Sequence, residues 1–170
     1  YCRPVTPARS RAAEMAAKQT LIATAADPSH MSEDCIFCQI VAGEMPSHAV
    51  YESDAAYAFL DVNPLARGHT VVVPKGHYER LGDMPDDVAG GLFQAINEIT
   101  PAVEAAVDAP ASTVGFNNGE EAGQEIHHAH CHIVPRFEGD GAGAIHTLFD
   151  GVADVSDEEM SDLADEIRDR

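Results

Sequence analysis

Basic residues are scarce in this 170-residue chain, which has 10 lysines and arginines against 29 aspartates and glutamates. Lysine occurs only at Lys18 and Lys75, and the formal net charge is −19. A protein that follows a nucleic-acid backbone needs a stripe of basic side chains to neutralise the phosphates. The sequence contains no such stripe, so we expect no nucleic-acid partner.

Long hydrophobic runs and a dense set of cysteines are also absent. No apolar segment approaches the roughly 20 residues that cross a bilayer, so we expect no membrane partner. The best candidate for a signal sequence, residues 21–26, is too short. Four cysteines do not form the disulfide framework of a small secreted domain. We therefore expect a cytoplasmic protein, long enough to bury one hydrophobic core without disulfides.

The acidic charge is distributed unevenly. Residues 1–30 carry four basic and two acidic side chains, a net charge of +2, which leaves −21 for the other 140 residues. The acids of that larger part are spread along the chain and are not grouped in one block. Such a surface suits concentrated salt, where screening suppresses self-repulsion, and we expect a halophilic source. An acidic tail that binds a basic partner is the alternative.

Composition divides the chain into three parts. Residues 1–30 are rich in alanine and nearly free of large apolar side chains, which predicts a disordered or weakly helical extension. We interpret Met31 as the natural start, which makes the preceding segment a remnant of upstream translation or processing, and a transit peptide is the alternative. The main domain is expected at residues 31–145, and an acidic helical tail at residues 146–170.

Hydrophobic periodicity predicts several strands and one long helix. An apolar stripe at helical spacing predicts a scaffold helix from Pro85 to Asp108, which Pro101 would kink or divide in two. In the tail, Ser156 and Glu159 form a capping box that predicts a helix start. Runs rich in β-branched and aromatic residues predict strands at 49–52, 57–62, 69–74 and 112–117.

A row of histidines is the most unusual feature of the sequence. Residues 127–136 read His-His-Ala-His-Cys-His-Ile-Val-Pro-Arg, and the Ile-Val-Pro ending predicts an extended strand. Side chains alternate between the two faces of a strand, so His128, His130 and His132 share one face. The opposite face is mostly small or apolar. We expect that face to pack in the core, with His127 buried as a packing residue.

Three interpretations of the row compete. Each imidazole has two polar nitrogens that need partners, so three in a row are not an ordinary packing feature. Imidazole nitrogens bind zinc, copper and nickel, which makes a metal site one interpretation. A second interpretation, a solvated polar face, requires no function at all. It is the weakest of the three, because chance does not readily produce histidines in strict alternation. The third is nucleophilic catalysis, in which one ring attacks while its neighbours hold it and stabilise charge.

Cys35 and Cys38 form a Cys-x-x-Cys that leads into a short helix ending at Gly43. A redox pair is disfavoured because no βαβ pattern follows it. A zinc site needs two further ligands, and these must be histidines because the chain has no second Cys-x-x-Cys. The candidates are His48, His69, His77 and the three histidines of the row.

The row and the residues before it resemble a known family signature. Residues 117–126 read Asn-Asn-Gly-Glu-Glu-Ala-Gly-Gln-Glu-Ile and lead directly into the row. An Asn-x-Gly, a Gly-Gln and then three histidines alternating with apolar residues are typical of the histidine-triad (HIT) nucleotide-binding proteins. The resemblance covers about residues 34–137 and includes a second block in matching order and spacing: Phe59-Leu60-Asp61, Pro64, Gly68-His69-Thr70 and Pro74-Lys75-Gly76-His77.

The resemblance implies an α+β fold, in which a five-stranded antiparallel sheet is accompanied by one long helix and short helices. It also implies that two such sheets join across a two-fold axis in a homodimer. The Cys-x-x-Cys and Asn117 fit the histidine-triad nucleotide-binding (Hint-like) branch. The branch that cleaves dinucleoside polyphosphates usually has Gln at the position of Asn117.

The family motif assigns the nucleophile to His130, which would form a nucleotidyl-histidine intermediate. A carbonyl on a neighbouring strand is expected to hold its other nitrogen and fix the tautomer. His132 and His69 match the catalytic positions that stabilise charge on the phosphate oxygens, either protonated or as hydrogen-bond donors. Asp61 matches the acid that holds the ribose hydroxyls, and Asn117 matches a position near the phosphates and the leaving group.

The loop before the row supplies the remaining nucleotide contacts that the resemblance implies. The backbone amides of Gln124 and Glu125 match donors to the phosphate. Glu125 departs from family members that have Ser or Thr at this position. Its carboxylate must therefore point away from the phosphate.

A structural metal is also implied by the resemblance. In family members with the Cys-x-x-Cys, zinc is held by the two thiolates, by the histidine of Pro-Lys-x-His and by the first histidine of the triad. The corresponding residues here are Cys35, Cys38, His77 and His128. Two sulfur and two nitrogen ligands make a closed structural site, so no metal is required for the chemistry itself.

The expected function is hydrolysis at the α-phosphate of purine nucleoside monophosphate derivatives, such as phosphoramidates of the form AMP–NH–R. The expected partners are such a purine nucleotide or conjugate and a second copy of the chain. Hydrolysis of dinucleoside polyphosphates is one alternative. A non-catalytic nucleotide-binding scaffold and metal handling by the histidines are the others.

Overall fold

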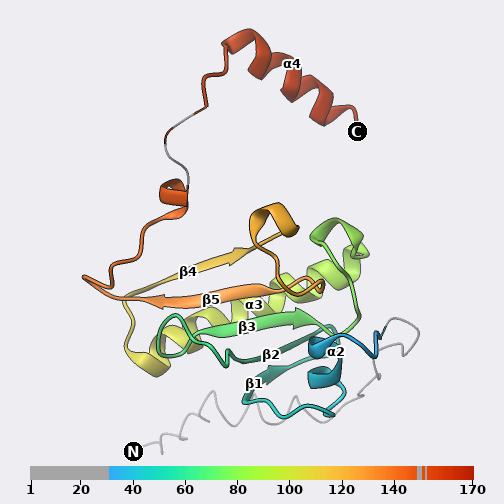
Figure 1. The fold of residues 1–170 in the computed structure, drawn as a ribbon, viewed down its shortest axis with the longest axis vertical. Coiled ribbons are helices and arrows are strands. Elements are labelled where there is room, and N and C mark those ends of the chain that lie inside the picture. Colours follow the sequence, from blue (N-terminus) through green and yellow to red (C-terminus); the bar gives the residue numbers. More distant parts are fainter. Residues whose placement is uncertain (1–30, 149–150, 152) are drawn as a thin grey trace, which may run out of the picture. The chain divides into compact units, whose positions relative to one another are not determined.

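The computed structural model describes residues 31–148, 151 and 153–170, so the extension expected at residues 1–30 lies outside the described residues. The chain divides into two compact units after Phe137, and each is described by itself. The first unit contains the sheet and the long helix, and the second contains the C-terminal helix (Figure 1).

A five-stranded sheet forms the centre of the first unit, and all neighbouring strands are antiparallel. Its spatial order is β1-β2-β3-β5-β4, so the last strand is inserted between β3 and β4. The strands are β1 (Ala49–Glu52), β2 (Ala56–Leu60), β3 (Thr70–Pro74), β4 (Ala111–Phe116) and β5 (Cys131–Arg136). The predicted α+β fold with a five-stranded antiparallel sheet and one long helix is confirmed.

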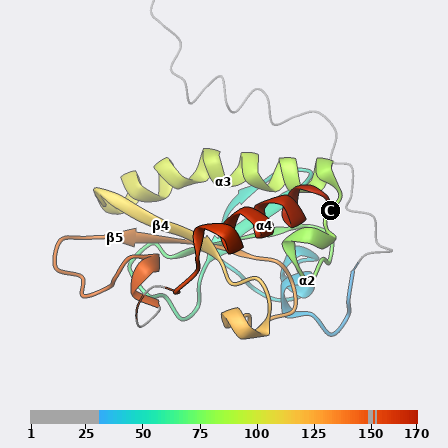
Figure 2. The ribbon, with the colours of Figure 1, turned by 90° about the horizontal axis from the view of Figure 1, so that it is seen from above.

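The long helix α3 (Asp86–Val107) lies across one face of the sheet, and the short helix α2 (Ile36–Val41) lies on the other side (Figure 2). Pro101 lies inside α3 and does not divide it into two helices. The helix ends where Asp108 adopts a left-handed backbone conformation, and the Ala109 N–H donates to the Glu104 carbonyl.

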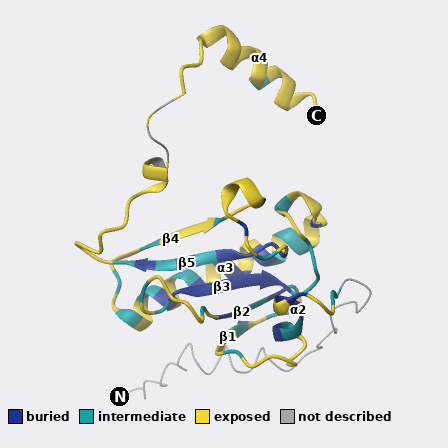
Figure 3. Ribbon diagram, in the orientation of Figure 1, coloured by how far each residue is buried: buried dark blue, intermediate teal, exposed yellow. Residues whose placement is uncertain are grey.

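Strand alternation sends buried side chains to both faces of the sheet. On the α3 side, apolar residues of the helix such as Leu92 and Ile96 share a cluster with Val72, Cys131 and Ile133. On the α2 side, a second cluster contains Phe37, Phe59, Val71 and Val73 with both cysteines of the Cys-x-x-Cys. All five residues of β3 are buried, whereas the edge strand β4 is largely exposed (Figure 3). The central strand therefore supports both layers.

The row of histidines departs from the predicted strand at its start. β5 begins at Cys131, so residues 127–130 are not part of the sheet ladder. The reason lies in their backbone hydrogen bonds: the His128 N–H donates to the Ile126 carbonyl, and the Ala129 N–H donates to Tyr78 O at 2.6 Å. The segment pairs with the chain that leaves β3, beyond the end of that strand at Pro74.

The second unit contains a 3₁₀ helix (Ile145–Leu148) and the helix α4 (Asp157–Arg168). The Ser156 hydroxyl accepts from the Glu159 N–H at 3.2 Å, and the Glu159 carboxylate accepts from the Ser156 N–H at 2.9 Å. The predicted capping box is therefore present. Met160, Leu163 and Ile167 are exposed. Within the described ranges, no helix is both long and apolar enough to cross a membrane.

Two adjacent glycines of α3 offer a matched test of how the helix packs on the sheet. A Cβ at Gly91 would overlap the methyl group of Ala55, whereas a Cβ at Gly90 would meet nothing within 4 Å. We expect Gly90→Ala to raise the free energy of unfolding by about 0.5–1 kcal/mol, because alanine favours helix. Gly91→Ala is expected to lower the free energy of unfolding, because the new methyl group would overlap that of Ala55 and neither the helix nor the chain at Ala55 can move away easily.

Denaturant unfolding of both variants at one pH checks the pair. Equal stabilisation by the two substitutions would contradict close packing of α3 at Gly91.

Candidate functional site

Four segments of the first unit converge on the α2 side of the sheet. They are the Cys-x-x-Cys with α2, the loop between β2 and β3, the chain that leaves β3, and the row of histidines. The rings of His128, His130 and His132 all face this side, although two of the three precede β5. His130 and His132 have ring centroids 5.0 Å apart, and Phe37 meets the ring of His130 edge-on at 5.2 Å. The predicted sharing of one face therefore holds without a continuous strand.

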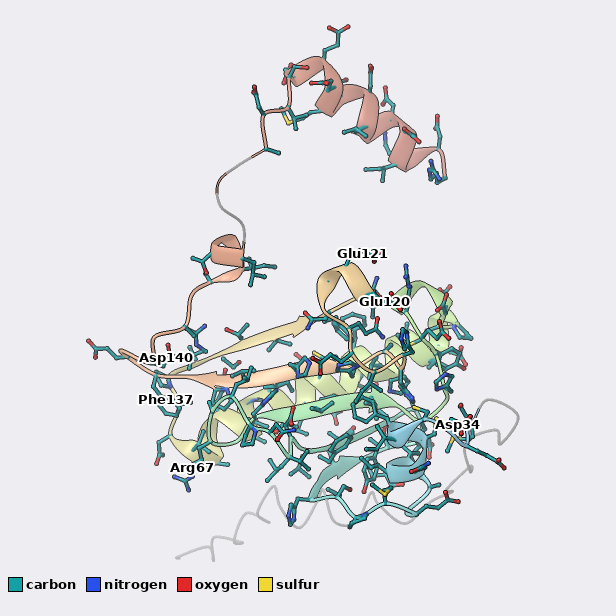
Figure 4. The ribbon with its side chains drawn as sticks, in the orientation of Figure 1. Asp34, Arg67, Glu120, Glu121, Phe137 and Asp140 are labelled. Carbon is teal, nitrogen blue, oxygen red and sulfur yellow. The ribbon has the colours of Figure 1, made fainter. Side chains whose placement is uncertain are left out.

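His127 is the exception among the histidines. Its side chain is 57% exposed, and its Nε2 lies 3.5 Å from a carboxylate oxygen of Glu120. Our prediction that His127 packs in the core is wrong, because the chain leaves the ladder before Cys131 and the alternation does not extend back to this residue. Figure 4 shows Glu120 and Glu121 on the loop between β4 and β5.

Cys35, Cys38, His77 and His128 lie together and could hold a metal ion. Their four candidate ligand atoms lie within 4.8 Å of one another. His128 Nδ1 lies 3.4 Å from Cys35 Sγ and 3.7 Å from Cys38 Sγ, and His77 Nδ1 lies 3.5 Å from Cys38 Sγ. In a zinc tetrahedron, bonds of about 2.3 Å to sulfur and about 2.05 Å to nitrogen separate S and N by about 3.6 Å. The observed spacings fit this geometry.

The protonation of these groups also suits a cation. The His128 Nε2–H donates to the Pro74 carbonyl at 3.0 Å, so its Nδ1 carries a lone pair towards the thiols. Burial lowers the pKa of His128 to about 4, and burial raises the pKa of Cys38 to about 11. Cys35 and Cys38 carry thiols and form no disulfide. Ionised sulfurs at this depth need a compensating positive charge.

His130 is held through one ring nitrogen. Its Nδ1 lies 2.7 Å from the His128 carbonyl oxygen. Because a carbonyl only accepts, Nδ1 carries a proton, and in the neutral form of the ring Nε2 carries the lone pair. Among the described residues, no protein atom is hydrogen-bonded to that Nε2. The holding carbonyl belongs to the same segment, two residues earlier, and not to a neighbouring strand as we expected.

His69 and His132 form a hydrogen-bonded pair beside His130. His69 Nε2 lies 3.0 Å from His132 Nδ1. His69 Nδ1 lies 3.2 Å from the Leu65 N–H and 3.5 Å from Oδ2 of Asp61. Burial lowers the pKa of His132 to about 4 and also lowers the pKa of His69, which the Asp61 carboxylate partly offsets. Both rings are therefore neutral near pH 7.

Asp61, His69 and His132 also offer ligand atoms within 4.8 Å of one another. The hydrogen bond between the two rings and the contact with the carboxylate account for this proximity. Asp61 is half-buried, and its Oδ1 accepts from the Asn63 N–H at 2.8 Å. The loop between β2 and β3 thus holds the carboxylate against the histidine pair.

The loop between β4 and β5 is fastened by the buried side chain of Gln124. Its Oε1 accepts from the Gly119 N–H at 2.7 Å, and its Nε2 donates to the carbonyls of Glu79 and Ile126 at 2.7 and 3.0 Å. The Gln124 backbone N–H donates to Gly119 O at 3.1 Å, so phosphate binding by this amide would require breaking that bond. The Glu125 N–H has no such partner in the part of the chain that the structure describes.

Asn117 and Glu125 lie at the exposed ends of this loop. The Asn117 side-chain amide donates to the Gly123 carbonyl at 3.5 Å. The Glu125 side chain is exposed. The predicted site residues therefore fall into a mostly buried part, formed by the histidines, the two cysteines and Gln124, and a more exposed part, formed by the half-buried Asp61 and the exposed Asn117 and Glu125.

The HIT domain family model matches residues 42–139, which is more than half of the chain. The chain belongs to the HIT family. Its HIT domain is similar to the adenylylsulfatase HINT3 of Arabidopsis thaliana, at 38% identity over 72% of this chain and 62% of the relative. It is also similar to the adenosine 5′-monophosphoramidase HNT1 of Candida albicans, at 32% identity over 80% of this chain and 94% of the relative.

A solved structure of a zinc-bound histidine triad family protein from Mycobacterium smegmatis has the same fold. Its TM-score is 0.60 at 36% identity, over 64% of this chain and 78% of that chain. The Cys-x-x-Cys of this HIT domain lies where the fold brings it beside two histidines. The recognition of the family from the sequence is therefore confirmed.

Several groups of this HIT site were not found from the sequence. The carbonyls of Pro74 and His128 hold the rings of His128 and His130, and the N–H of Leu65 favours an unprotonated Nδ1 on His69. A backbone group carries no residue signature, so no sequence pattern could have indicated these three. The sequence could not single out Phe37 either, because Ile36 is also apolar and lies between the same two cysteines, yet it is 41% exposed.

The buried amide of Gln124 predicts a measurable stability difference from its neighbour. Gln124→Ala leaves the Gly119 N–H and the Glu79 carbonyl without this partner, whereas the Ile126 carbonyl keeps its bond from the His128 N–H, and we expect the free energy of unfolding to fall by about 1–3 kcal/mol. Glu125→Ala, the matched control at an exposed position, is expected to change it by less than about 0.5 kcal/mol. Urea unfolding measures both variants, and equal effects would argue against the fastening role of Gln124.

Proposed function

We propose that this HIT protein is a nucleotide-binding hydrolase that cleaves adenosine 5′-monophosphate derivatives at the α-phosphate, with nitrogen in the leaving group. The observation that carries the proposal is the state of His130. One of its nitrogens is tied to a carbonyl at 2.7 Å, and the other lies beside the His69–His132 pair with no hydrogen-bond partner among the described residues. An imidazole held in this way can use the lone pair of its second nitrogen as a nucleophile.

The reaction proceeds in two displacements. In the first, the Nε2 lone pair of His130 attacks phosphorus, the P–N bond to the leaving group breaks, and the departing amine keeps the electron pair and takes a proton from solvent. In the second, a water oxygen attacks phosphorus and gives up a proton to solvent, and the P–Nε2 bond breaks with its electron pair returning to Nε2, which releases AMP and restores the ring. The sum is AMP–NH–R plus water giving AMP plus an amine.

The neighbouring groups fit the charges that develop. The ring of His130 becomes positive when its Nε2 is bonded to phosphorus, and the His128 carbonyl stabilises the Nδ1–H at that stage. His132 is neutral because burial lowers its pKa to about 4. It therefore acts on the phosphate oxygens as a hydrogen-bond donor and not as an imidazolium.

The nucleoside part has a candidate binding surface next to Asp61. The carboxylate can accept from the ribose hydroxyls, and the adjoining Leu60 and Val62 side chains are 37% and 81% exposed. Exposed apolar side chains beside a polar anchor suit a purine base next to a sugar. The names of the two relatives, an adenosine 5′-monophosphoramidase and an adenylylsulfatase, support an adenylyl group as the part that is recognised.

The metal centre contributes structure to this proposal. We propose that zinc is bound by Cys35, Cys38, His77 and His128, because their donor set and spacing fit a closed tetrahedral site. Such a metal supplies a cross-link between the start of α2 and the histidine row. The zinc-bound relative of known structure supports this assignment.

A second copy of the chain is the proposed protein partner. β4 is an edge strand, and its outer N–H and C=O groups have no neighbouring strand in the described part of the sheet. Val114 on this edge is 44% exposed, and the exposed Phe93 of α3 contacts Phe116 with ring centroids 5.9 Å apart. An unpaired edge with adjoining apolar groups supports a homodimer in which two sheets join.

Turnover of an adenosine phosphoramidate tests the proposed function. We expect His130→Ala to abolish turnover and to retain AMP binding, because the ring supplies the nucleophile. His127→Ala, at the exposed neighbouring histidine, should keep turnover within about twofold of the unaltered chain. The assays are release of the amine in high salt and the mass of a trapped nucleotidyl adduct. An unaltered chain that binds AMP without turnover would refute the proposal of an enzyme in favour of a nucleotide-binding scaffold.

Metal analysis tests the zinc proposal separately. Protein purified without added metal is expected to contain about one zinc per chain, and Cys38→Ser should lose it because a tetrahedral site tolerates no missing thiolate. Cys131→Ala serves as the control, since Cys131 is a buried thiol on the α3 side of the sheet. Less than about a tenth of a zinc per chain in the unaltered protein would count against the site.

A further inference from the structure

The Nδ1 atom of His69 lies between two groups with opposite requirements. The Leu65 N–H, 3.2 Å away, can donate only to an unprotonated Nδ1. The Asp61 carboxylate oxygen, 3.5 Å away, favours a protonated Nδ1. One nitrogen cannot satisfy both, so the neutral ring has two competing tautomers.

The choice of tautomer reaches His132 through the hydrogen bond between the rings. When Nδ1 of His69 is unprotonated, its Nε2–H donates to His132 Nδ1, and the Nε2 of His132 then carries a proton. When Nδ1 of His69 is protonated, its Nε2 accepts from His132 Nδ1–H, and the Nε2 of His132 is then a lone pair. The 3.0 Å separation allows only one proton between the rings. His132 therefore presents either a donor or an acceptor at its outer nitrogen.

We propose that His69 is a positioning residue that transmits ribose recognition at Asp61 to His132, switching the outer nitrogen of His132 to a hydrogen-bond donor. This inference rests on the proposed function. When the ribose hydroxyls donate to the Asp61 carboxylate, that carboxylate holds a proton on His69 less well. The Leu65 N–H then determines the tautomer, and His132 offers its N–H to the phosphate.

Burial of the pair supports transmission through hydrogen bonds and not through direct contact. His69 is 2% exposed, so its ring cannot touch a substrate, whereas Asp61 and His132 are only half-buried. Burial lowers the pKa of both rings, so each carries one proton near pH 7, and the question is which nitrogen holds it. Asp61 Oδ1 is already bonded to the Asn63 N–H, which leaves Oδ2 to serve either the ribose or His69.

The protonation of individual ring nitrogens can be measured by ¹⁵N NMR on histidine-labelled full-length protein near pH 7.5. In the nucleotide-free protein we expect His132 Nε2 to be unprotonated in a large fraction of molecules. Saturating AMP should shift it to the protonated form. 2′,3′-Dideoxy-AMP, which lacks both hydroxyls, should bind more weakly and leave the tautomer as in the nucleotide-free protein.

A variant tests the switch without any nucleotide. Asp61→Asn removes the charge that favours a proton on His69 Nδ1, so the nucleotide-free variant should already show the tautomer of the AMP-bound protein. Asp54→Asn, which removes one exposed carboxylate in the turn between β1 and β2, is the matched control and should resemble the unaltered chain. Identical tautomers in the unaltered chain and in Asp61→Asn would overturn the proposal.

A kinetic comparison gives a second readout. In the unaltered chain, a 2′,3′-dideoxyadenosine phosphoramidate should lose about tenfold in kcat as well as in affinity, because the donor state of His132 is no longer selected. In Asp61→Asn the difference in kcat between the two sugars should disappear, whereas a purely binding role for Asp61 would affect KM alone. If AMP does not bind at all, the proposed function fails, and the nucleotide-free comparison of the two chains still decides the switch.

Discussion

One residue, His128, joins the two halves of the site. Its ring faces the cysteine thiols at 3.4 and 3.7 Å, and its backbone carbonyl accepts from His130 Nδ1 at 2.7 Å. A third bond, from Nε2–H to the Pro74 carbonyl, fixes the ring against the end of β3. The position of the His130 ring therefore depends on the same backbone that the proposed zinc would hold. In the proposed function, this dependence links the structural metal site to the imidazole that attacks phosphorus.

Burial is the main cause of the shifted pKa values of these rings. Apolar residues of α2 and β3 surround the histidines, and Phe37 contacts the rings of both His128 and His130. Burial lowers the pKa of His128 and His132 to about 4, so their rings are neutral near pH 7. For His128 the Pro74 carbonyl defines the tautomer, whereas the tautomers of His69 and His132 depend on each other through their hydrogen bond. Among the described residues, every side-chain nitrogen and oxygen atom that is fully shielded from solvent has a hydrogen-bond partner.

The sequence predicted the parts of this arrangement that depend on side-chain identity and periodicity. Strands β1 to β4 agree with their predicted positions within two residues at each end, whereas β5 begins at Cys131, later than the predicted strand of the histidine row. The Cys-x-x-Cys with His77 and His128, indicated by the family resemblance, comes together in space. The period of two also predicted that three histidines share one face. It failed at His127, because the segment pairs with Tyr78 instead of β3. The sequence could not indicate that the Gln124 side chain points into the protein, since a glutamine in a loop carries no signal of burial.

Backbone groups and neutral rings, more than cations, determine how this acidic protein would bind an anionic substrate. Lys75 is paired with Glu52 at 2.6 Å, and Asp61 adds a negative charge at the site itself. The proposed donors to the phosphate are the Glu125 N–H and the outer nitrogen of His132, and both are neutral dipoles. Salt weakens the attraction between full charges over about 10 Å at 0.1 M and over shorter distances at higher concentrations. Oriented N–H groups in direct contact with a phosphate lose little by such screening, because they act at hydrogen-bond distance. An acidic surface and an uncharged set of phosphate donors are therefore compatible with each other, and in the proposed switch the tautomers of His69 and His132 decide whether the site attracts an anion.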